Sequence, residues 1–311
     1  MDVLPGGCVT NGRRGLVPGA VYHYGRSASM PTLYLNNGDL MNYTKVQIQR
    51  LIELGDNPNL GMGFASDEDR DSSFRQLERK LIQENKAVLA LLRGRKRPEV
   101  RLVEQKLIKG LTKLDFIEVL TPVMMSRGML EKMGLTEEMP LWRQVYWVDG
   151  NKCLRPMLAP HLYYMLRQLK RHWGEPLKIF EIGSCFRKET KGSNHTEEFT
   201  MLNLVCHGCS QPLEELQNTV KELFEPFHLS YQLVEEKSEI YGCTIDITVK
   251  GMEIASAAVG PHRLDQNWDI SGSWYGMGLG LERFTMVLKG YRTIRRVGKS
   301  LSYQDGARLN I

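Results

Sequence analysis

The residues from Lys178 to Asn203 constrain the fold more than any other stretch, because two strand-forming segments flank a polar loop. β-Prone residues around Phe180 and Ile182 come first, and those around Met201 come last. Lys191 to Asn194 lie between them and are residue types that favour loops. The pattern predicts a two-stranded hairpin.

The predicted hairpin carries side chains suited to a nucleotide. Arg187 offers a planar guanidinium to a phosphate or a carboxylate, Glu189 accepts hydrogen bonds from an exocyclic amine, and Phe199 offers a ring for a purine to stack on. Arg187 and Glu189 are two residues apart, so a shared solvated strand face is the alternative interpretation.

A second block, Gly276 to Arg283, favours the nucleotide site. Its alternating glycines let a backbone approach a ligand just before a helix that presents an arginine. The two blocks together resemble the class II aminoacyl-tRNA synthetases, whose second motif is an Arg-x-Glu hairpin followed by a Phe. The third motif of that family is a Gly-x-Gly-x-Gly stretch closed by Glu-Arg. The resemblance implies an α+β catalytic fold, an antiparallel sheet flanked by helices.

Within this class, further segments are similar to pyrrolysyl-tRNA synthetases, from about Tyr43 to the C-terminus. These segments are Leu154 to Pro160, Lys178 to Asn203, Tyr241 and Gly242, Val259 to Pro261, Ser302 and Tyr303, and Asp305 and Gly306. A catalytic part without a large preceding domain is similar to the bacterial form, whose N-terminal tRNA-binding domain is a separate polypeptide. The resemblance implies ATP, Mg²⁺, pyrrolysine and a cognate tRNA as ligands, and a homodimer.

Three regions are expected along the chain. Residues 1–42 form an irregular extension without helical or strand periodicity. Residues 43–97 form a basic helical region, with helices from Tyr43 to Leu54 and from Phe74 to Leu92, and with Asp67 to Asp71 in the link between them. This region either contacts tRNA phosphates or presents a solvated helix face. Residues 98–311 form the class II core.

The elements expected in the core support this fold class. A helix opens at Pro98 and is followed by a strand from Ile117 to Leu120 and by Pro122, which resembles the first class II motif and the dimer interface it builds. Runs of strands without regular βαβ alternation argue for an antiparallel sheet and against a Rossmann fold. The remaining expected elements are a helix from Pro160 whose apolar stripe includes Trp173, a helix from Leu213 to Phe227, strands Ser230–Val234, Tyr241–Val249 and Met252–Val259, and a turn at Lys250 and Gly251.

Charge and cysteine content fit an intracellular enzyme. The formal net charge of +5 is compatible with a nucleic-acid partner. Cys206 and Cys209 have metal-like spacing, but a structural zinc site needs four ligands, so a strand end and turn is the expected reading. No apolar run is long enough for a bilayer and the start lacks a signal-peptide core, so the protein is expected in the cytoplasm and away from membranes.

The resemblance assigns residues to an ATP site. It implies that Arg187 and Arg283 are catalytic, with Arg187 on the α-phosphate and the substrate carboxylate and Arg283 on the triphosphate tail. The other implied contacts are Glu189 to the adenine amine, Phe199 stacked on adenine, His195 and Thr196 in the ATP loop, and Glu253 and Ser256 on Mg²⁺. Thr196 stands where leucine is expected, and Cys243 stands where aspartate is expected.

The resemblance also implies an amino-acid pocket formed by Ala159, Leu162, Tyr163, Leu166, Asn203, Val205, Tyr241, Ala258 and Trp274. The amide of Asn203 would orient one polar group of the substrate inside an otherwise apolar cavity. A class II synthetase for phenylalanine or phosphoserine, and a non-catalytic synthetase-like sensor, are the alternatives. Phosphoserine would need cations in the pocket, and none of these residues is one.

Overall fold

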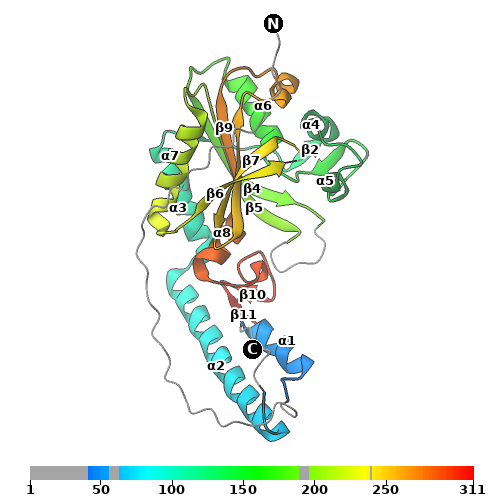
Figure 1. Ribbon diagram of the computed structural model, residues 1–311, viewed down its shortest axis with the longest axis vertical. Helices are drawn as coiled ribbons and strands as arrows, with labels where there is room; N and C mark the ends of the chain where they lie inside the picture. Colours follow the sequence, from blue (N-terminus) through cyan, green and yellow to red (C-terminus); the bar gives the residue numbers. More distant parts are fainter. Residues whose placement is uncertain (1–40, 56–62, 189–195, 239) are drawn as a thin grey trace.

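The computed structural model describes residues 41–55, 63–188, 196–238 and 240–311 (Figure 1). A seven-stranded sheet lies at its centre, in the order β1-β4-β5-β9-β8-β7-β6. Strand β1 runs parallel to β4, and every other neighbouring pair is antiparallel. The strands are β1 (Ile117–Glu118), β4 (Leu177–Phe186), β5 (Glu198–His207), β9 (Trp274–Gly280), β8 (Met252–Gly260), β7 (Gly242–Val249) and β6 (Gln232–Ser238).

Three helices cover one face of the sheet: α3 (Glu99–Lys113), α7 (Pro212–Phe224) and α8 (Leu281–Lys289). Each presents an apolar stripe to the strands, and Leu107, Val220 and Phe284 are fully buried there. This layered arrangement of helices on a largely antiparallel sheet confirms the predicted α+β class.

The other face is covered by α6 (Ala159–Leu169) and by shorter elements. These are α4 (Arg127–Lys132), α5 (Pro140–Arg143), the hairpin of β2 (Met124–Ser126) and β3 (Lys152–Leu154), and the 3₁₀ turn η2 (Arg263–Trp268). The second core that they form includes Leu162, Tyr163, Val205 and Trp274, four residues expected in the amino-acid pocket. The sequence analysis did not predict α4, α5, β2 or β3.

A separate small unit joins the two ends of the described chain. It contains α1 (Lys45–Leu54), the long helix α2 (Asp67–Arg95) and the ribbon of β10 (Tyr303–Gln304) and β11 (Ala307–Arg308). The buried amide of Asn85 holds them together: Nδ2 donates to the carbonyl oxygens of Leu54 and Leu81, and Oδ1 accepts from the backbone N–H of Arg308. The last residues therefore pack on the basic helical region.

Several predicted boundaries were wrong. Asp67 to Asp71 form the first turns of α2, where acidic side chains interact favourably with the helix N-terminus, and Ser66 caps that end. Trp173 lies beyond α6 and is 40% exposed, so it does not belong to the apolar stripe. Strand β1 has two residues, Ile117 and Glu118, and its pairing with β4 ends with the hydrogen bond from the backbone N–H of Val119 to the carbonyl oxygen of Phe180. The helix after the hairpin ends at Phe224 and continues as η1 (Glu225–Phe227).

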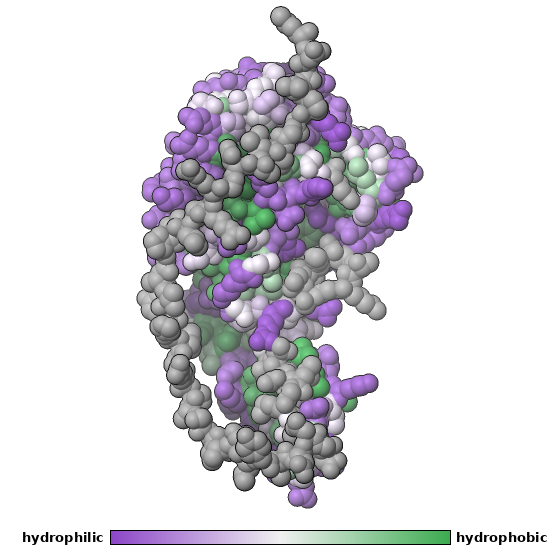
Figure 2. Space-filling view, viewed as in Figure 1, coloured by the Kyte–Doolittle hydropathy of each residue, from purple (hydrophilic) through white to green (hydrophobic). Residues whose placement is uncertain are grey.

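On the face shown in Figure 2, hydrophilic side chains lie mainly toward the outer parts and hydrophobic side chains gather toward the middle. Among the described helices, none combines the length and apolar character needed to cross a membrane.

Candidate active site

A cavity of about 600 Å³ lies where β5, β8 and β9 face α6. Every predicted site residue that the structure describes lines it. They are Ala159, Leu162, Tyr163, Leu166, Arg187, Thr196, Phe199, Asn203, Val205, Tyr241, Glu253, Ser256, Ala258, Trp274 and Arg283. Glu189 and His195 lie outside the described residues. Residues far apart in sequence thus converge on one space of the size that holds a small-molecule ligand.

Arg187 follows the last residue of β4 and is held in place by main-chain groups. Its Nε donates to the carbonyl oxygen of Pro156 at 2.9 Å, and its backbone N–H donates to the carbonyl oxygen of Glu197 at 3.0 Å. The guanidinium carbon lies 5.3 Å from the ring centroid of Phe199. Stacking and the Nε bond fix the plane of the fork before any ligand arrives.

A buried ion pair supports the strand that carries Arg187. Arg155 and Glu181 are 3% and 1% exposed, and Nη1 of Arg155 lies 2.7 Å from Oε1 of Glu181. The other Glu181 oxygen accepts from the hydroxyl of Thr121 at 2.6 Å, and Nε of Arg155 donates to the carbonyl of Ser184 at 2.8 Å. A side chain at position 183 would collide with Arg155, because a Cβ there would lie 2.0 Å from Nη2, and Gly183 leaves the necessary space.

Arg155 is also next to the group that orients Arg187. Its carbonyl oxygen accepts from the backbone N–H of Phe186 at 3.0 Å, and the next carbonyl, that of Pro156, accepts from Arg187. The sequence analysis assigned no role to Arg155 or Glu181. Their alternation with apolar residues gave no sign that they pair across 26 positions.

A β-bulge in β8 brings Glu253 and Ser256 to the same face of the sheet. Thr248 pairs with Glu253 and Ile247 pairs with Ala255, so Ile254 is an extra residue opposite β7. Side chains in a regular strand alternate, and residues three apart point to opposite faces. The extra residue reverses that alternation, so both side chains line the cavity.

Two neighbouring groups engage this pair. The hydroxyl of Ser256 donates to Oδ1 of Asp246 at 2.6 Å, and the hydroxyl of Thr244 donates to the same oxygen at 3.2 Å. Arg283, in the first turn of α8, donates from Nη1 to the backbone oxygen of Glu253 at 3.1 Å and lies 3.6 Å from its carboxylate. Asp246 therefore adds a carboxylate that the sequence analysis missed.

The glycines of β9 form a floor without side chains. Gly278 pairs with both Asn203 on β5 and Ser256 on β8. A Cβ on Gly278 would lie 2.9 Å from Oδ1 of Asn203, and one on Gly276 would lie 3.2 Å from the carbonyl oxygen of Leu204. The amide of Asn203 therefore occupies space that any larger residue at position 278 would take.

Aromatic side chains form the wall at the amino-acid end of the cavity. The ring of Tyr163 stacks on Trp268 at 5.5 Å and meets Trp274 edge-on at 5.8 Å, and Tyr241 lies 6.3 Å from Trp274. Burial, with Tyr241 and Asp265 close by, raises the pKa of the Tyr163 phenol. Its hydroxyl therefore stays protonated and uncharged throughout the physiological range.

Glu282 is a buried acid behind the glycine floor. It is 2% exposed, and its Oε2 accepts from the backbone N–H of Thr200 at 2.8 Å, which ties α8 to β5. Burial raises the pKa of this carboxyl, partly opposed by the Thr200 bond. Glu282 is part of the Glu-Arg pair that closes the block from Gly276 to Arg283. The sequence pattern did not show whether this residue joins two elements of the fold or contacts a ligand.

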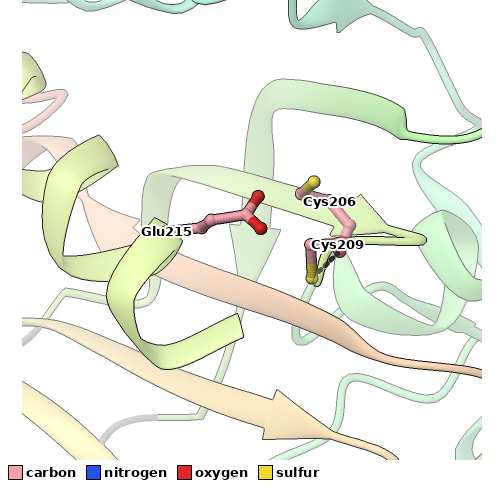
Figure 3. A group of neighbouring side chains, drawn as sticks. All are labelled: Cys206, Cys209 and Glu215. Atoms are coloured by element: carbon pink, nitrogen blue, oxygen red, sulfur yellow. Dashed lines mark hydrogen bonds between the residues drawn. The ribbon is translucent and has the colours of Figure 1, made fainter. Parts of the chain in front are cut away.

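A second cluster lies apart from the cavity lining, at the end of β5 (Figure 3). Cys206, Cys209 and Glu215 place their donor atoms within 4.8 Å of one another. Oε1 of Glu215 accepts from the backbone N–H of Ser210 at 3.0 Å, and the thiol of Cys209 points to the carbonyl of Cys206 at 3.9 Å. Burial raises the pKa of both thiols, to about 12 for Cys206. These contacts match the strand end and turn predicted for the segment.

The comparisons with known proteins agree with this geometry. A family model for the tRNA synthetases class II core domain (F) matches residues 142–304. A pyrrolysyl-tRNA synthetase structure from Desulfitobacterium hafniense is 44% identical, with 87% of this chain and 99% of that chain covered and a TM-score of 0.81. A second structure of a pyrrolysyl-tRNA synthetase from that organism is 43% identical, with 90% and 100% covered and a TM-score of 0.80.

A more distant relative shares part of the fold. The proline–tRNA ligase of Thermoplasma volcanium is 29% identical over 136 residues, which are 40% of this chain, and the chain spans 29% of the length of that ligase. The class II core match, and the near-complete coverage of the two solved structures, place the protein by both sequence and fold. The chain belongs to the pyrrolysyl-tRNA synthetase family of class II aminoacyl-tRNA synthetases.

Proposed function

We propose that this protein activates pyrrolysine with ATP and transfers it to a cognate tRNA. One observation carries the proposal: a single cavity joins a charged end, with Arg187, Arg283 and Glu253, to an apolar end that holds the amide of Asn203. The charged end suits a nucleotide triphosphate, and the apolar end suits a long uncharged side chain. The family membership supports the same activity.

Activation requires alignment and charge neutralisation rather than a covalent enzyme intermediate. A carboxylate oxygen of the amino acid attacks the α-phosphorus of ATP, the bond to the bridging oxygen breaks, and pyrophosphate leaves with that electron pair. Arg187 neutralises charge on the α-phosphate and the carboxylate while Arg283 holds the phosphate tail, each acting as a fixed donor in a preorganised site. Glu189, His195 and Phe199 would hold the adenine and the ATP loop.

Transfer uses the same cavity. A ribose hydroxyl at the end of the tRNA attacks the acyl carbon, the bond to the phosphate oxygen breaks, and AMP leaves as the hydroxyl proton is lost. AMP is then the leaving group and Arg187 would remain on its phosphate. One arginine, positioned by Pro156, therefore serves both steps.

The oxygen donors on β8 fit a magnesium ion that also binds phosphate. Glu253 and Ser256 face the cavity together, and Asp246 supplies a further carboxylate against Ser256. Mg²⁺ prefers such oxygen ligands and usually shares them with substrate phosphates and water. When bound, the ion would offset charge on the phosphates. Glu253 also holds Arg283, so the cation and the arginine would be placed by the same residue.

The amino-acid end favours pyrrolysine over the two alternatives. Ala159, Leu162, Leu166, Val205 and Ala258 are apolar and line the cavity with the three aromatic side chains. Phosphoserine would bury a phosphate among them without a cation. Phenylalanine would offer no hydrogen-bonding group to the amide of Asn203, because its ring carries none.

The partner proposals rest on the outer surface. Ile117, Leu120, Val123 and Met124 are 47%, 82%, 41% and 42% exposed and follow one another beside the free edge of β1. Such a patch is typical of a protein interface, so we propose that it pairs with a second copy in a homodimer. Leu120→Asp should then shift the sedimentation coefficient to that of a monomer.

The tRNA would lie on the basic helical region, where α2 presents exposed cations. These are Arg75, Arg79, Lys80, Lys86 and Arg93. A separate N-terminal tRNA-binding polypeptide would add contacts, and the cytoplasm would supply both the tRNA and the amino acid. Reversing cations on α2 should weaken tRNA charging more at low than at high salt, because salt screens the phosphate contacts, and should leave pyrophosphate exchange unchanged.

Amino-acid-dependent ATP–pyrophosphate exchange tests the activity, with pyrrolysine, a side-chain-acylated lysine, lysine, phenylalanine and phosphoserine as substrates. We expect exchange with the first two. Exchange that is fastest with phenylalanine or phosphoserine would replace the proposal by another class II specificity. Binding of ATP or an amino acid without any exchange would indicate a sensor instead.

A further inference from the structure

The indole of Trp274 is anchored from behind the amino-acid pocket by a buried carboxylate. Its Nε1 donates to Oδ2 of Asp265 at 2.8 Å, and Asp265 is 3% exposed. The same oxygen accepts from the backbone N–H of His262 at 2.7 Å. Asp265 belongs to η2 and is absent from the cavity lining, so it reaches the pocket through Trp274.

Gly260, on the neighbouring strand, leaves the space that the indole of Trp274 occupies. Trp274 pairs with Gly260 on β8, where a Cβ would lie 2.0 Å from Nε1. The indole edge meets the ring of Tyr163, and Tyr163 stacks in turn on Trp268 of η2. Asp265 and Trp268 therefore hold two of the aromatic wall residues from the same turn.

The second carboxylate oxygen of Asp265 is buried and makes no hydrogen bond to the described residues. Oδ1 of Asp265 and the hydroxyl of Tyr163 are both buried and find no hydrogen-bond partner among the described residues. A buried carboxylate with an unused oxygen costs stability. The other oxygen accepts hydrogen bonds from Trp274 and from the backbone N–H of His262. These two bonds are what we expect of a residue that holds the aromatic wall of the pocket in place.

We propose that Asp265 is the positioning residue that sets the shape of the amino-acid pocket, by holding the indole of Trp274 against the substrate side chain. The inference rests on the proposed function and concerns the amino-acid end alone. The ATP end is built from β4, β8 and α8, whereas the hydrogen bonds of the Asp265 side chain go to Trp274 and to the backbone of His262. Loss of the anchor is therefore expected to weaken amino-acid binding and to leave ATP binding as it is.

Two variants separate the hydrogen bonds from the charge. Asn at position 265 keeps a carbonyl oxygen for the indole and for the His262 N–H, and places its amide next to the Tyr163 hydroxyl, which can accept. Ala removes both bonds. Gln266→Ala is the matched control, because Gln266 is the exposed neighbour on the same turn.

Exchange kinetics on the full chain provide the test. Asp265→Ala should raise the KM for pyrrolysine about tenfold or more, with the KM for ATP changed by less than about twofold. Asp265→Asn should stay close to the wild type, and Gln266→Ala should match it. In a Trp274→Phe background, where the indole N–H is missing, Asp265→Ala should add little further effect.

A readout independent of activity accompanies the kinetics. Asp265→Ala should change the near-ultraviolet circular dichroism of the tryptophans, and that change should vanish in the Trp274→Phe background. Equal KM values in wild type and Asp265→Ala, a proportional rise in both KM values, or Asn behaving like Ala would each overturn the inference. An inactive wild type would instead overturn the proposed function, and the dichroism comparison would still decide on the anchor.

Discussion

The guanidinium of Arg187 is tied to the chain at Pro156, whose carbonyl oxygen lies 2.9 Å from Nε. This bond occupies Nε, and the side chain lines the cavity. An arginine held in this way is fixed in orientation, and a lysine has no equivalent of Nε with which to make the bond.

Replacing Arg187 should remove activity and spare the fold. Arg187→Ala should lower exchange about a hundredfold or more, because one charge-assisted donor to the reacting phosphate is lost. Arg187→Lys should recover little of this, since an ammonium does not reproduce the planar fork. Exchange and thermal melting are the measurements. Wild-type exchange in either variant would exclude this hairpin as the reaction site.

The buried pair of Arg155 and Glu181 should dominate the stability of this part of the molecule. Glu181→Gln leaves the Arg155 charge buried without a counter-charge, and we expect the free energy of unfolding to fall by about 3–5 kcal/mol. Urea denaturation measures this value, and Glu236→Gln on exposed β6 is the control. A change below about 1 kcal/mol would show that the pair is solvated.

The two oxygen donors on β8, Glu253 and Ser256, should set the Mg²⁺ concentration that exchange requires. Ser256→Ala and Glu253→Gln each remove an oxygen donor, so both should raise the Mg²⁺ concentration needed for half-maximal exchange. Ser256→Ala also removes one of the two hydroxyls that donate to Oδ1 of Asp246. The measurement is exchange at saturating ATP over a Mg²⁺ titration, with Glu236→Gln as the unaffected control. An unchanged midpoint in both variants would remove these residues from the metal site.

Free lysine should be a poor substrate although it is a fragment of pyrrolysine. Its ammonium would lose water among apolar side chains, which costs several kcal/mol even after relaxation, and each 1.4 kcal/mol is about tenfold in kcat/KM. Asp265 does not offset this cost, because it lies behind Trp274. Comparison of kcat/KM for lysine and an acylated lysine checks the prediction. Similar values would contradict it, and so would unchanged pyrrolysine activation in Asn203→Ala.

The sequence predicts the parts of the fold and of the site that depend on residues close together in the chain. The hairpin around Arg187 and the glycine block before Arg283 were found because turn residues and strand residues are local properties. The predicted contents of the ATP loop at Glu189 and His195 remain predictions, since those residues lie outside the described part of the chain. The regions proposed as 1–42, 43–97 and 98–311 likewise remain proposals.

The rest depends on contacts between distant residues. The bulge at Ile254 breaks the alternation that identifies strand faces, so Glu253 and Ser256 look as though they point apart. Arg155 and Glu181 meet only when two strands and a loop pack together, and Asp265 gains its role from an indole on another strand. Short elements such as α4 and β2 lack enough residues to show a period.

The glycine floor of β9 also governs how this pocket can change. Glycine is the smallest residue, so any substitution at Gly276 or Gly278 adds side-chain volume and can only make the cavity smaller. Room for a bulkier amino acid must therefore come from the opposite wall, where truncation of Leu162 or Leu166 on α6 enlarges the cavity. Substitutions that admit larger substrates are therefore confined to the wall opposite the glycines of β9. We expect new amino-acid specificities to evolve through changes on that wall while the glycines stay the same.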